Sequence, residues 1–241
     1  MKEVNPYTHF SKIYAHLMKS VDYSFWAKYI KEIHSTLGNI TDIALELAAG
    51  NGKLSKYLKK QFSELYISDY SISMLKLKKK NQTAVCCNML NLPFKIEFDF
   101  IFSAFDSINY LDNENKLIEF FKAVNQVLSS DGIFTFDVSL LENSIKHLKK
   151  LNRSGIYKGI KYNQISELNK KTRIHKNSVE IILPNGEVYK EIHNQKIYDF
   201  YYYFEAVELA GLYIVECFDA FSFEDGNPDS ERIQFIVRRK N

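Results

Sequence analysis

Cysteine is scarce in this 241-residue chain, and it contains no long apolar run. Three cysteines, Cys86, Cys87 and Cys217, cannot build a disulfide framework, which favours a reducing compartment. No stretch approaches the roughly 18 consecutive apolar residues of a transmembrane helix. Met1 to Asn5 lack the basic and then apolar pattern of a signal peptide. We therefore expect a cytoplasmic protein without a membrane partner.

The sequence also lacks a concentrated basic stripe, internal repeats and the Cys/His spacing of a zinc site. The net charge is only +3, and the lysines between residues 76 and 80 fit a solvated helix end. We therefore expect no metal site, and a small-molecule partner is favoured over nucleic acid. The sequence is compatible with either a monomer or a homodimer.

Residues 43–55 join an apolar strand, a glycine turn and the start of a helix. The run Ile43–Leu47 is typical of a parallel strand covered on both faces, yet it carries an acid, Glu46, near its carboxyl end. Gly50 and Gly52 can take positive φ and let a ligand approach the backbone closely. A helix that begins there presents free N–H groups, which predicts a nucleotide-like ligand with an anionic group.

Strand and helix patterns alternate up to residue 138, which predicts an α/β fold with a doubly wound, mostly parallel sheet. Two further strands near the end of the chain predict an antiparallel hairpin at the sheet edge, giving seven strands. The expected strands are 42–47, 65–68, 84–87, 98–103, 133–138, 213–218 and 233–238, and the expected helices are 52–61, 71–80, 114–128 and 199–209.

Two segments depart from this alternation. Residues 7–37 have helical spacing with a break near Asp22, and Gly38-Asn39 stops the second helix, so two helices are expected before the first strand. After a short helix over 141–151, residues 159–164, 173–183 and 188–198 alternate like antiparallel strands, and Pro184-Asn185-Gly186 predicts a hairpin between the last two. The sequence therefore predicts an antiparallel insert on the parallel sheet.

The order and spacing of several short motifs resemble those of the class I S-adenosylmethionine-dependent methyltransferases. The resemblance runs from Tyr7 to Arg239, and Phe10-x-x-x-Tyr14 with Asp106–Leu111 is similar to the bacterial small-molecule type. The other motifs are Glu46–Gly52, Asp69–Leu75, Asn88-Met89, Leu92–Phe94, Phe98–Ser103 and Leu128–Gly132. The resemblance implies a Rossmann-like methyltransferase fold, S-adenosylmethionine as cofactor, and a small acceptor methylated on nitrogen or oxygen.

The resemblance also implies how the chain is divided into domains. Residues 1–140 and 199–241 would form the cofactor-binding methyltransferase domain, with residues 1–38 as a helical lid. Residues 141–198 would form an antiparallel cap over the acceptor side.

Asp69 is the strongest candidate for cofactor binding, because a carboxylate at a strand end can accept hydrogen bonds from both ribose hydroxyls. Its alternative role is a cap for the helix that starts near Ser71. The resemblance implies that Glu46 orders the glycine loop and that Tyr14 belongs to the lid. The full expected set is Tyr14, Glu46, Ala49, Gly50, Gly52, Asp69, Tyr70, Asn88, Met89 and Phe105.

Three of these residues carry further expectations. Asn88 would accept a hydrogen bond from the adenine amino group, and Met89 would contact the ring. Phe105 would lie near the sulfonium, where an aromatic ring is favourable. Core packing is an equal alternative for Met89 and Phe105, and helix packing is favoured for Trp26.

The catalytic residues are not fixed by the sequence, because methyl transfer depends mainly on positioning. His147, His175 and His193 are candidate bases. Several tyrosines could line an acceptor pocket, although core packing explains them better: Tyr110, Tyr198 and Tyr201 to Tyr203. Ser103–Asp106 stands where methyltransferases acting on nucleobase or glutamine amino groups have an Asn-Pro-Pro-Tyr-like tetrad.

Two other functions stay open. An RNA or protein acceptor would use the basic residues between 146 and 161. A non-catalytic cofactor-binding module would explain Asn88 and Ala15, which stand where the family usually has Asp. A nicotinamide dehydrogenase is less favoured, since Ser55 occupies the third position of Gly-x-Gly-x-x-Gly.

Overall fold

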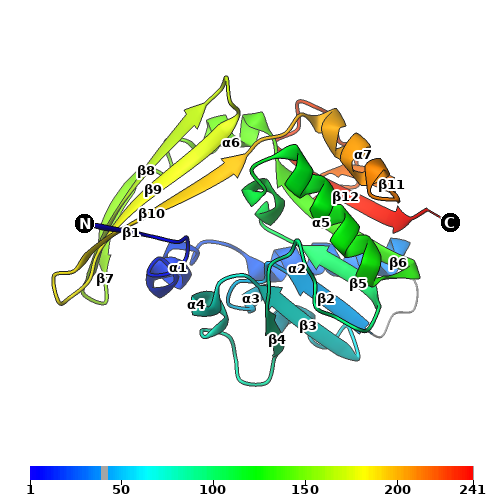
Figure 1. Ribbon diagram of the computed structural model, residues 1–241, viewed down its shortest axis with the longest axis horizontal. Coiled ribbons are helices and arrows are strands. Elements are labelled where there is room, and N and C mark those ends of the chain that lie inside the picture. The colour runs from blue at the N-terminus through cyan, green and yellow to red at the C-terminus, as the bar shows by residue number, and fades with distance from the viewer. Residues whose placement is uncertain (39–42, 241) are drawn as a thin grey trace.

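The computed structural model describes residues 1–38 and 43–240 and contains two β-sheets (Figure 1). The strands of the larger sheet lie in the order β11 (Leu212–Asp219), β12 (Arg232–Arg239), β6 (Leu128–Ser139), β5 (Phe98–Ser103), β2 (Ile43–Leu47), β3 (Glu64–Asp69) and β4 (Thr83–Cys86). The last five run parallel, whereas β12 is antiparallel to both β6 and β11. The predicted seven-stranded, mostly parallel fold is confirmed.

Helices cover both faces of this sheet, because alternate strand residues point to opposite sides. One face packs against α2 (Tyr23–Leu37) and α3 (Lys53–Leu58), and the other packs against α5 (Glu114–Val127) and α7 (Phe200–Leu209). Neighbouring strand residues accordingly divide between the two cores, with Ala44 and Phe100 on the first face and Leu45 and Ile101 on the second. The packed helices hold the sheet rigid, so the carboxyl ends of its parallel strands lie along one edge.

The second sheet consists mainly of the predicted insert. Its strand order is β1 (Lys2–Val4), β10 (Val188–Lys196), β9 (Ile174–Ile182), β8 (Ile160–Asn169) and β7 (Arg153–Tyr157). The four insert strands are antiparallel, and the hairpin predicted at Pro184–Gly186 joins β9 to β10. The N-terminal strand β1 pairs with β10 in parallel, and no sequence pattern predicted it.

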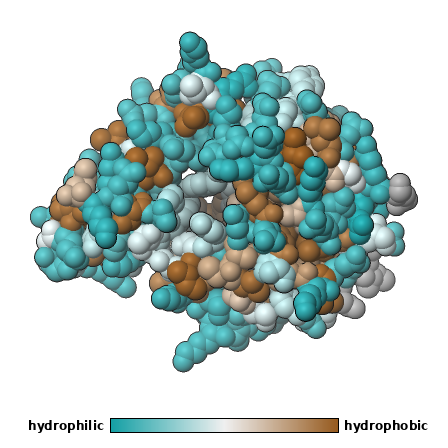
Figure 2. Space-filling model, in the orientation of Figure 1, coloured by the Kyte–Doolittle hydropathy of each residue, from teal (hydrophilic) through white to brown (hydrophobic). Residues whose placement is uncertain are grey.

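The two N-terminal helices belong to different cores. Helix α1 (Ser11–Leu17) packs on the second sheet through Phe10, Ile13 and Leu17, whereas α2 packs on the larger sheet. The segment from α1 to α2 therefore bridges the two sheets. Figure 2 shows a hollow in this face of the molecule, between the second sheet and the α/β sheet.

Several predicted boundaries were wrong. Helix α4 covers only Ile72–Leu75 instead of 71–80, because the chain turns and Lys79 N–H donates to the Gln82 side chain. Strand β6 starts at residue 128 instead of 133, and an irregularity in its pairing with β5 absorbs Ser129 to Gly132. Helix α3 ends at Leu58 instead of Gln61. Asn39 and Asp42, expected at the helix stop and the strand start, lie outside the described residues.

Candidate functional site

The glycine turn after β2 forms a tight, left-handed piece of backbone at the carboxyl edge of the sheet. Gly50 and Gly52 have φ values of 59° and 64°, which glycine adopts without strain. A Cβ on Gly50 would lie 3.1 Å from Met74 Cε, and a Cβ on Gly52 would lie 2.8 Å from the Gln82 side-chain amide. The turn therefore needs glycine at both positions.

Asp69, the last residue of β3, holds this turn in place. Its Oδ2 accepts a hydrogen bond from Gly50 N–H at 2.7 Å, and its Oδ1 accepts one from Ser71 N–H at 2.7 Å. Burial raises the pKa of Asp69, although the two backbone donors act in the opposite direction. Each carboxylate oxygen keeps a second lone pair for a ribose hydroxyl. The cap of α4 is Ser71 itself, so the alternative role of Asp69 as that cap was wrong.

Glu46 lies beneath the turn and is almost fully buried. The hydroxyl of Ser55, in the first turn of α3, donates to its carboxyl group. Burial raises the pKa of Glu46 to about 8, because the hydrogen bonds from Ser55 only partly offset the loss of water. At neutral pH the carboxyl group is thus largely protonated, and it links the end of β2 to the start of α3.

Asn88 lies two residues after the end of β4, which pairs with β3. Cys87 N–H donates to the carbonyl of Asp69 at 3.1 Å, which brings the next residue beside the ribose candidate. Asn88 is exposed, and its Oδ1 accepts a hydrogen bond from Leu90 N–H at 3.0 Å. The oxygen expected to meet adenine therefore also shapes a local turn.

The remaining predicted residues of this region differ in burial. Met89 is half-buried against the larger core, and Tyr70 is 73% exposed beside Asp69. Ala49 N–H donates to the Ser68 carbonyl at 2.9 Å, which ties the glycine turn to β3. Tyr70 and Asn88 are thus exposed members of the predicted set.

Phe105 follows β5 in a strained conformation, with φ of 63°. Its ring centroid lies 4.3 Å from that of Trp26 and 5.4 Å from that of Tyr23, both on α2. Phe105 therefore packs on the α2 side of the sheet. Trp26 packs in the same cluster, which is the role predicted for it.

Tyr14 reaches from α1 toward the same edge of the sheet. Its hydroxyl is hydrogen-bonded to Tyr23, and burial raises its pKa well above the usual value. Lys53 Nζ lies 4.2 Å from the centre of the Tyr23 ring, at the start of α3. The lid residue and the glycine turn are therefore linked through Tyr23.

A buried charge network, missed in the sequence, lies at the ends of β5, β6 and β12. Arg232 Nη2 donates to Asp106 Oδ1 at 2.9 Å, and its Nη1 donates to Asp137. Gln195 of the second sheet donates to the other Asp106 oxygen at 2.6 Å. Burial raises the pKa of Asp137 to about 6 although Arg232 opposes it. An acid inside the apolar strand 133–138 was the available signal.

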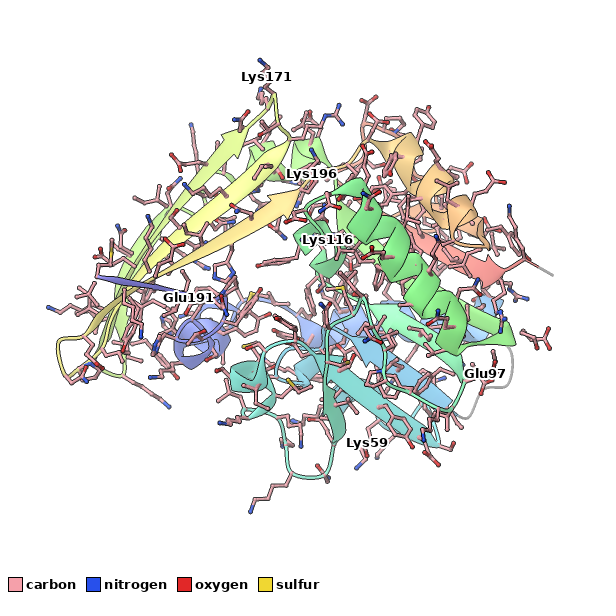
Figure 3. The ribbon with its side chains drawn as sticks, in the orientation of Figure 1. Lys59, Glu97, Lys116, Lys171, Glu191 and Lys196 are labelled. Atoms are coloured by element: carbon pink, nitrogen blue, oxygen red, sulfur yellow. The ribbon has the colours of Figure 1, made fainter. Side chains whose placement is uncertain are left out.

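A second network joins the N-terminal segment, the 3₁₀ helix η1 (Ser107–Tyr110) and β10. Tyr7 Oη lies 2.9 Å from Tyr110 Oη, which lies 3.1 Å from His193 Nδ1. Glu191 is fully buried behind His193 and points from β10 toward the start of α1 (Figure 3). Of the three candidate histidines, only His193 is joined in this way to residues near the predicted cofactor site.

The other candidates serve the structure in different ways. His175 is buried in the second sheet and bonded to Ser166 and Ser144. Tyr198 donates to the Leu111 carbonyl at 2.7 Å, and Tyr203 is fully buried in the core. Tyr201 is 66% exposed, so these tyrosines do not form one pocket.

Comparison with known proteins agrees with this geometry. Residues 45–136 match the family model described as a methyltransferase domain. Over these residues the chain is similar to a methyltransferase domain. The predicted family is thereby confirmed, and the matched segment runs from β2 to β6, so it contains the glycine turn and Asp69.

A Bacillus subtilis (strain 168) protein, YqeM, named provisionally as a methyltransferase, is 32% identical over 139 residues. That match covers 55% of this chain and 55% of the relative, so the chain matches little more than half of its length. A solved S-adenosylmethionine-dependent methyltransferase from Clostridium acetobutylicum ATCC 824 has a TM-score of 0.79 at 24% identity, covering 98% of this chain and 99% of the other. This likeness shows that the fold extends beyond the family match.

The sugar N-methyltransferase KedS8 from Streptoalloteichus sp. ATCC 53650 has the same fold, with a TM-score of 0.73 at 15% identity. The superposition covers 93% of this chain and 91% of KedS8. Within residues 1–38 and 43–240, no group of side chains is arranged to hold a metal ion, and no helix is long and apolar enough to span a membrane.

Proposed function

We propose that this protein transfers a methyl group from S-adenosylmethionine to a nitrogen or oxygen atom of a small polar molecule. The observation that carries the proposal is the pair of hydrogen bonds that Asp69 accepts from Gly50 N–H and Ser71 N–H, at the carboxyl edge of the larger sheet. These bonds hold a carboxylate and a glycine turn side by side. Ribose hydroxyls and a methionyl group need those two features at that spacing.

The residues present fit the cofactor. A Cβ at Gly50 or Gly52 would crowd Met74 or Gln82, so glycine at both positions keeps the turn compact beside the methionyl group, with Glu46 shaping the loop from below. Asp69 would hold the ribose, while Asn88 and Met89 would lie along the adenine. When bound, the cofactor supplies a methyl group on a sulfonium, and the acceptor atom bonds to that carbon as its bond to sulfur breaks.

We assign the acceptor side to the second sheet, with residues 141–198 as its cap. The inward side chains of β8, β9 and β10 are mostly polar and buried: Gln164, Ser166, His175, Asn177, Glu191 and His193. Such a lining suits an acceptor with several hydrogen-bonding groups better than an apolar one. The likeness to a sugar N-methyltransferase supports an amine of a sugar-like molecule. The domain division predicted from the sequence is part of this proposal.

The insert offers less support for a macromolecular acceptor. Lys146, one of the basic residues considered for RNA binding, is paired with Glu231 at 2.6 Å. A cytoplasmic location is part of the proposal and rests on the three cysteines, which are all unpaired.

The proposal is tested by transfer of a labelled methyl group from S-adenosylmethionine to a defined panel of acceptors. The panel would contain glucosamine, galactosamine, their nucleoside diphosphate esters, simple primary amines and catechol. We expect transfer to at least one hydroxylated amine, and Asp69→Ala should abolish it. Total RNA serves as the competing acceptor, and transfer to RNA alone would contradict a small-molecule function.

A further inference from the structure

A line of hydroxyl, imidazole and carboxyl groups leads from the N-terminal segment into the second sheet. Tyr7 Oη, Tyr110 Oη and His193 Nδ1 are separated by 2.9 and 3.1 Å. On the far side of the ring, His193 Nε2 lies 3.4 Å from Glu191 Oε2. The first three atoms are within hydrogen-bonding distance, so a proton can pass from Tyr7 to the imidazole.

The imidazole end of this line is buried and incompletely bonded. His193 is 4% exposed and Glu191 is fully buried. Within the described part of the chain, neither His193 Nε2 nor Glu191 Oε2 has a hydrogen-bond partner. Buried polar groups normally have partners, so this pair calls for an explanation. A proton added to the imidazole would turn the two groups into a close ion pair.

Glu191 is held in position by the N-terminal segment. Its Oε1 accepts hydrogen bonds from His9 N–H at 2.6 Å and from Phe10 N–H at 2.9 Å. These bonds fix the carboxylate so that the other oxygen faces His193. The Tyr7 and Phe10 rings also contact His193, with centroids 4.9 and 5.1 Å from that of the imidazole.

Strained backbone occurs at Tyr7 and a few residues before Tyr110. Tyr7 itself has φ of 64°, and Phe105 and Asp106, just before η1, have φ values of 63° and 49°. Non-glycine residues rarely adopt this conformation, and such strain gathers at functional sites. The fold therefore maintains an unfavourable backbone on each side of the contact between Tyr7 and Tyr110.

The Tyr7 end of the line lies toward the cofactor site. Burial, followed by the neighbouring Tyr110 and the charges of Asp69 and Asp106, raises the pKa of Tyr7 well above the usual value. The hydroxyl stays protonated at neutral pH. A neutral hydroxyl can accept a proton on its oxygen while it gives up its own, as a relay requires.

We propose that Tyr7, Tyr110 and His193 form a proton relay for methyl transfer, with Glu191 as the positioning residue that stabilises the protonated imidazole. This inference rests on the proposed function. As the acceptor atom bonds to the methyl carbon, its N–H or O–H proton moves to the Tyr7 oxygen. The Tyr7 proton moves to Tyr110, and the Tyr110 proton moves to His193 Nδ1.

The electron pair of the broken N–H or O–H bond stays on the acceptor atom and neutralises the charge gained with the methyl group. Both tyrosines end neutral, and the positive charge rests on His193 beside Glu191. The proton then returns along the same line to water once the product has left.

The first test needs no acceptor and uses ¹⁵N NMR of the full chain labelled at histidine. His193→Asn assigns the imidazole resonances, and we expect Nδ1 of His193 to accept a hydrogen bond. Tyr110→Phe should shift that Nδ1 resonance toward the value of a nitrogen without a donor. His34→Asn, which alters a buried histidine of α2 that packs on the larger sheet, should leave it in place. An unchanged resonance in Tyr110→Phe would overturn the relay.

The second test measures methyl transfer to glucosamine, or to the panel compound that reacts fastest. His193→Asn and Tyr110→Phe should lower kcat about 100-fold with little change in KM, as expected for loss of general base catalysis. Glu191→Gln keeps an oxygen for His9 and Phe10 but loses the charge, so an intermediate loss of about tenfold is expected. His34→Asn, which alters a buried histidine of α2 packed on Phe62 and Phe100, should stay near the wild-type rate.

The outcomes separate the relay from the proposed function. Wild-type transfer together with unchanged kcat in His193→Asn and Tyr110→Phe would refute the relay and leave the methyltransferase intact. Absence of transfer to every panel compound would contradict the proposed function, and the NMR result would then decide the relay alone. Loss of thermal stability without loss of kcat would show that the line only holds α1 on the second sheet.

Discussion

The proposed cofactor side joins residues that are close in sequence, whereas the proposed acceptor side joins residues that are far apart in sequence. Gly50, Gly52 and Asp69 lie within 20 residues of each other, and Asp69 bonds to two main-chain N–H groups. On the proposed acceptor side, Glu191 meets His9 across 182 positions. In the charge network that Gln195 links to this side, here called the acceptor network, Arg232 meets Asp106 across 126 positions. The first arrangement tolerates few sequences, whereas the second can be rebuilt with other side chains to suit another acceptor.

The largest effect is expected from removal of the cation of the acceptor network. Arg232→Met leaves Asp106 and Asp137 buried without their common partner. We expect the free energy of unfolding to fall by about 3–5 kcal/mol. The measurement is urea denaturation at pH 7.

Arg239→Met is the matched control on the same strand. Its ion pair with Glu97 is 3.6 Å long and partly exposed, so a loss of about 1 kcal/mol or less is expected. Equal losses in both variants would show that the acceptor network does not stabilise the fold.

The next effect concerns the glycine turn. Gly52→Ala combines a φ of 64° with a Cβ placed 2.8 Å from the Gln82 amide. We expect a loss of about 1–2 kcal/mol in the free energy of unfolding and weaker cofactor binding. Denaturation and calorimetric titration would measure the two effects.

Gly186→Ala is the matched control, because it introduces the same backbone strain at a positive φ without crowding a neighbouring side chain. Gly186 has φ of 86° but nothing within 4 Å of the added Cβ, and it lies in the hairpin between β9 and β10. It should lose stability without losing cofactor binding. A similar loss of binding in Gly186→Ala would contradict the local role of the turn.

A separate effect, which depends on pH, is expected at Glu46. Its pKa is raised to about 8 in the folded state, while the unfolded chain has the usual value of 4.5. The folded state therefore holds a proton that the unfolded state releases, and stability falls as pH rises from about 4.5 to 8. Each tenfold difference in proton affinity between the two states corresponds to about 1.4 kcal/mol.

Glu46→Gln removes this titration, so its stability should fall less than that of the wild type between pH 5 and pH 8. Thermal denaturation across this range would measure the difference. Parallel curves for the two proteins would mean that Glu46 is ionised in the fold.

The smallest effect is expected at an exposed ion pair of the insert. Lys146 contacts Glu231 at 2.6 Å, but both side chains are about half exposed. Lys146→Ala should change the free energy of unfolding by about 0.5 kcal/mol or less. A large change, measured by urea denaturation, would show that α6 (Leu141–His147) depends on this contact.

Sequence reasoning reached the cofactor side because its signals are local. Parallel strands end at the same edge of a sheet, so a glycine turn after one strand and an acid at the end of the next are expected to lie close together. The structure shows this, since Gly50 N–H donates to Asp69. The acceptor side was largely hidden, since β1 joins β10 and Tyr7 meets Tyr110 only after the chain has folded. His193 was one candidate among three, and only its bond to Tyr110 separates it from His147 and His175.

The most direct test of the cofactor site is calorimetric titration of the protein with S-adenosylhomocysteine. We predict micromolar binding by the wild type and by Asp112→Ala, which breaks an exposed ion pair with Lys116 far from the glycine turn in sequence. Asp69→Ala should show no measurable binding. Absence of binding by the wild type, or full binding by Asp69→Ala, would contradict the cofactor site described by Gly50, Gly52 and Asp69.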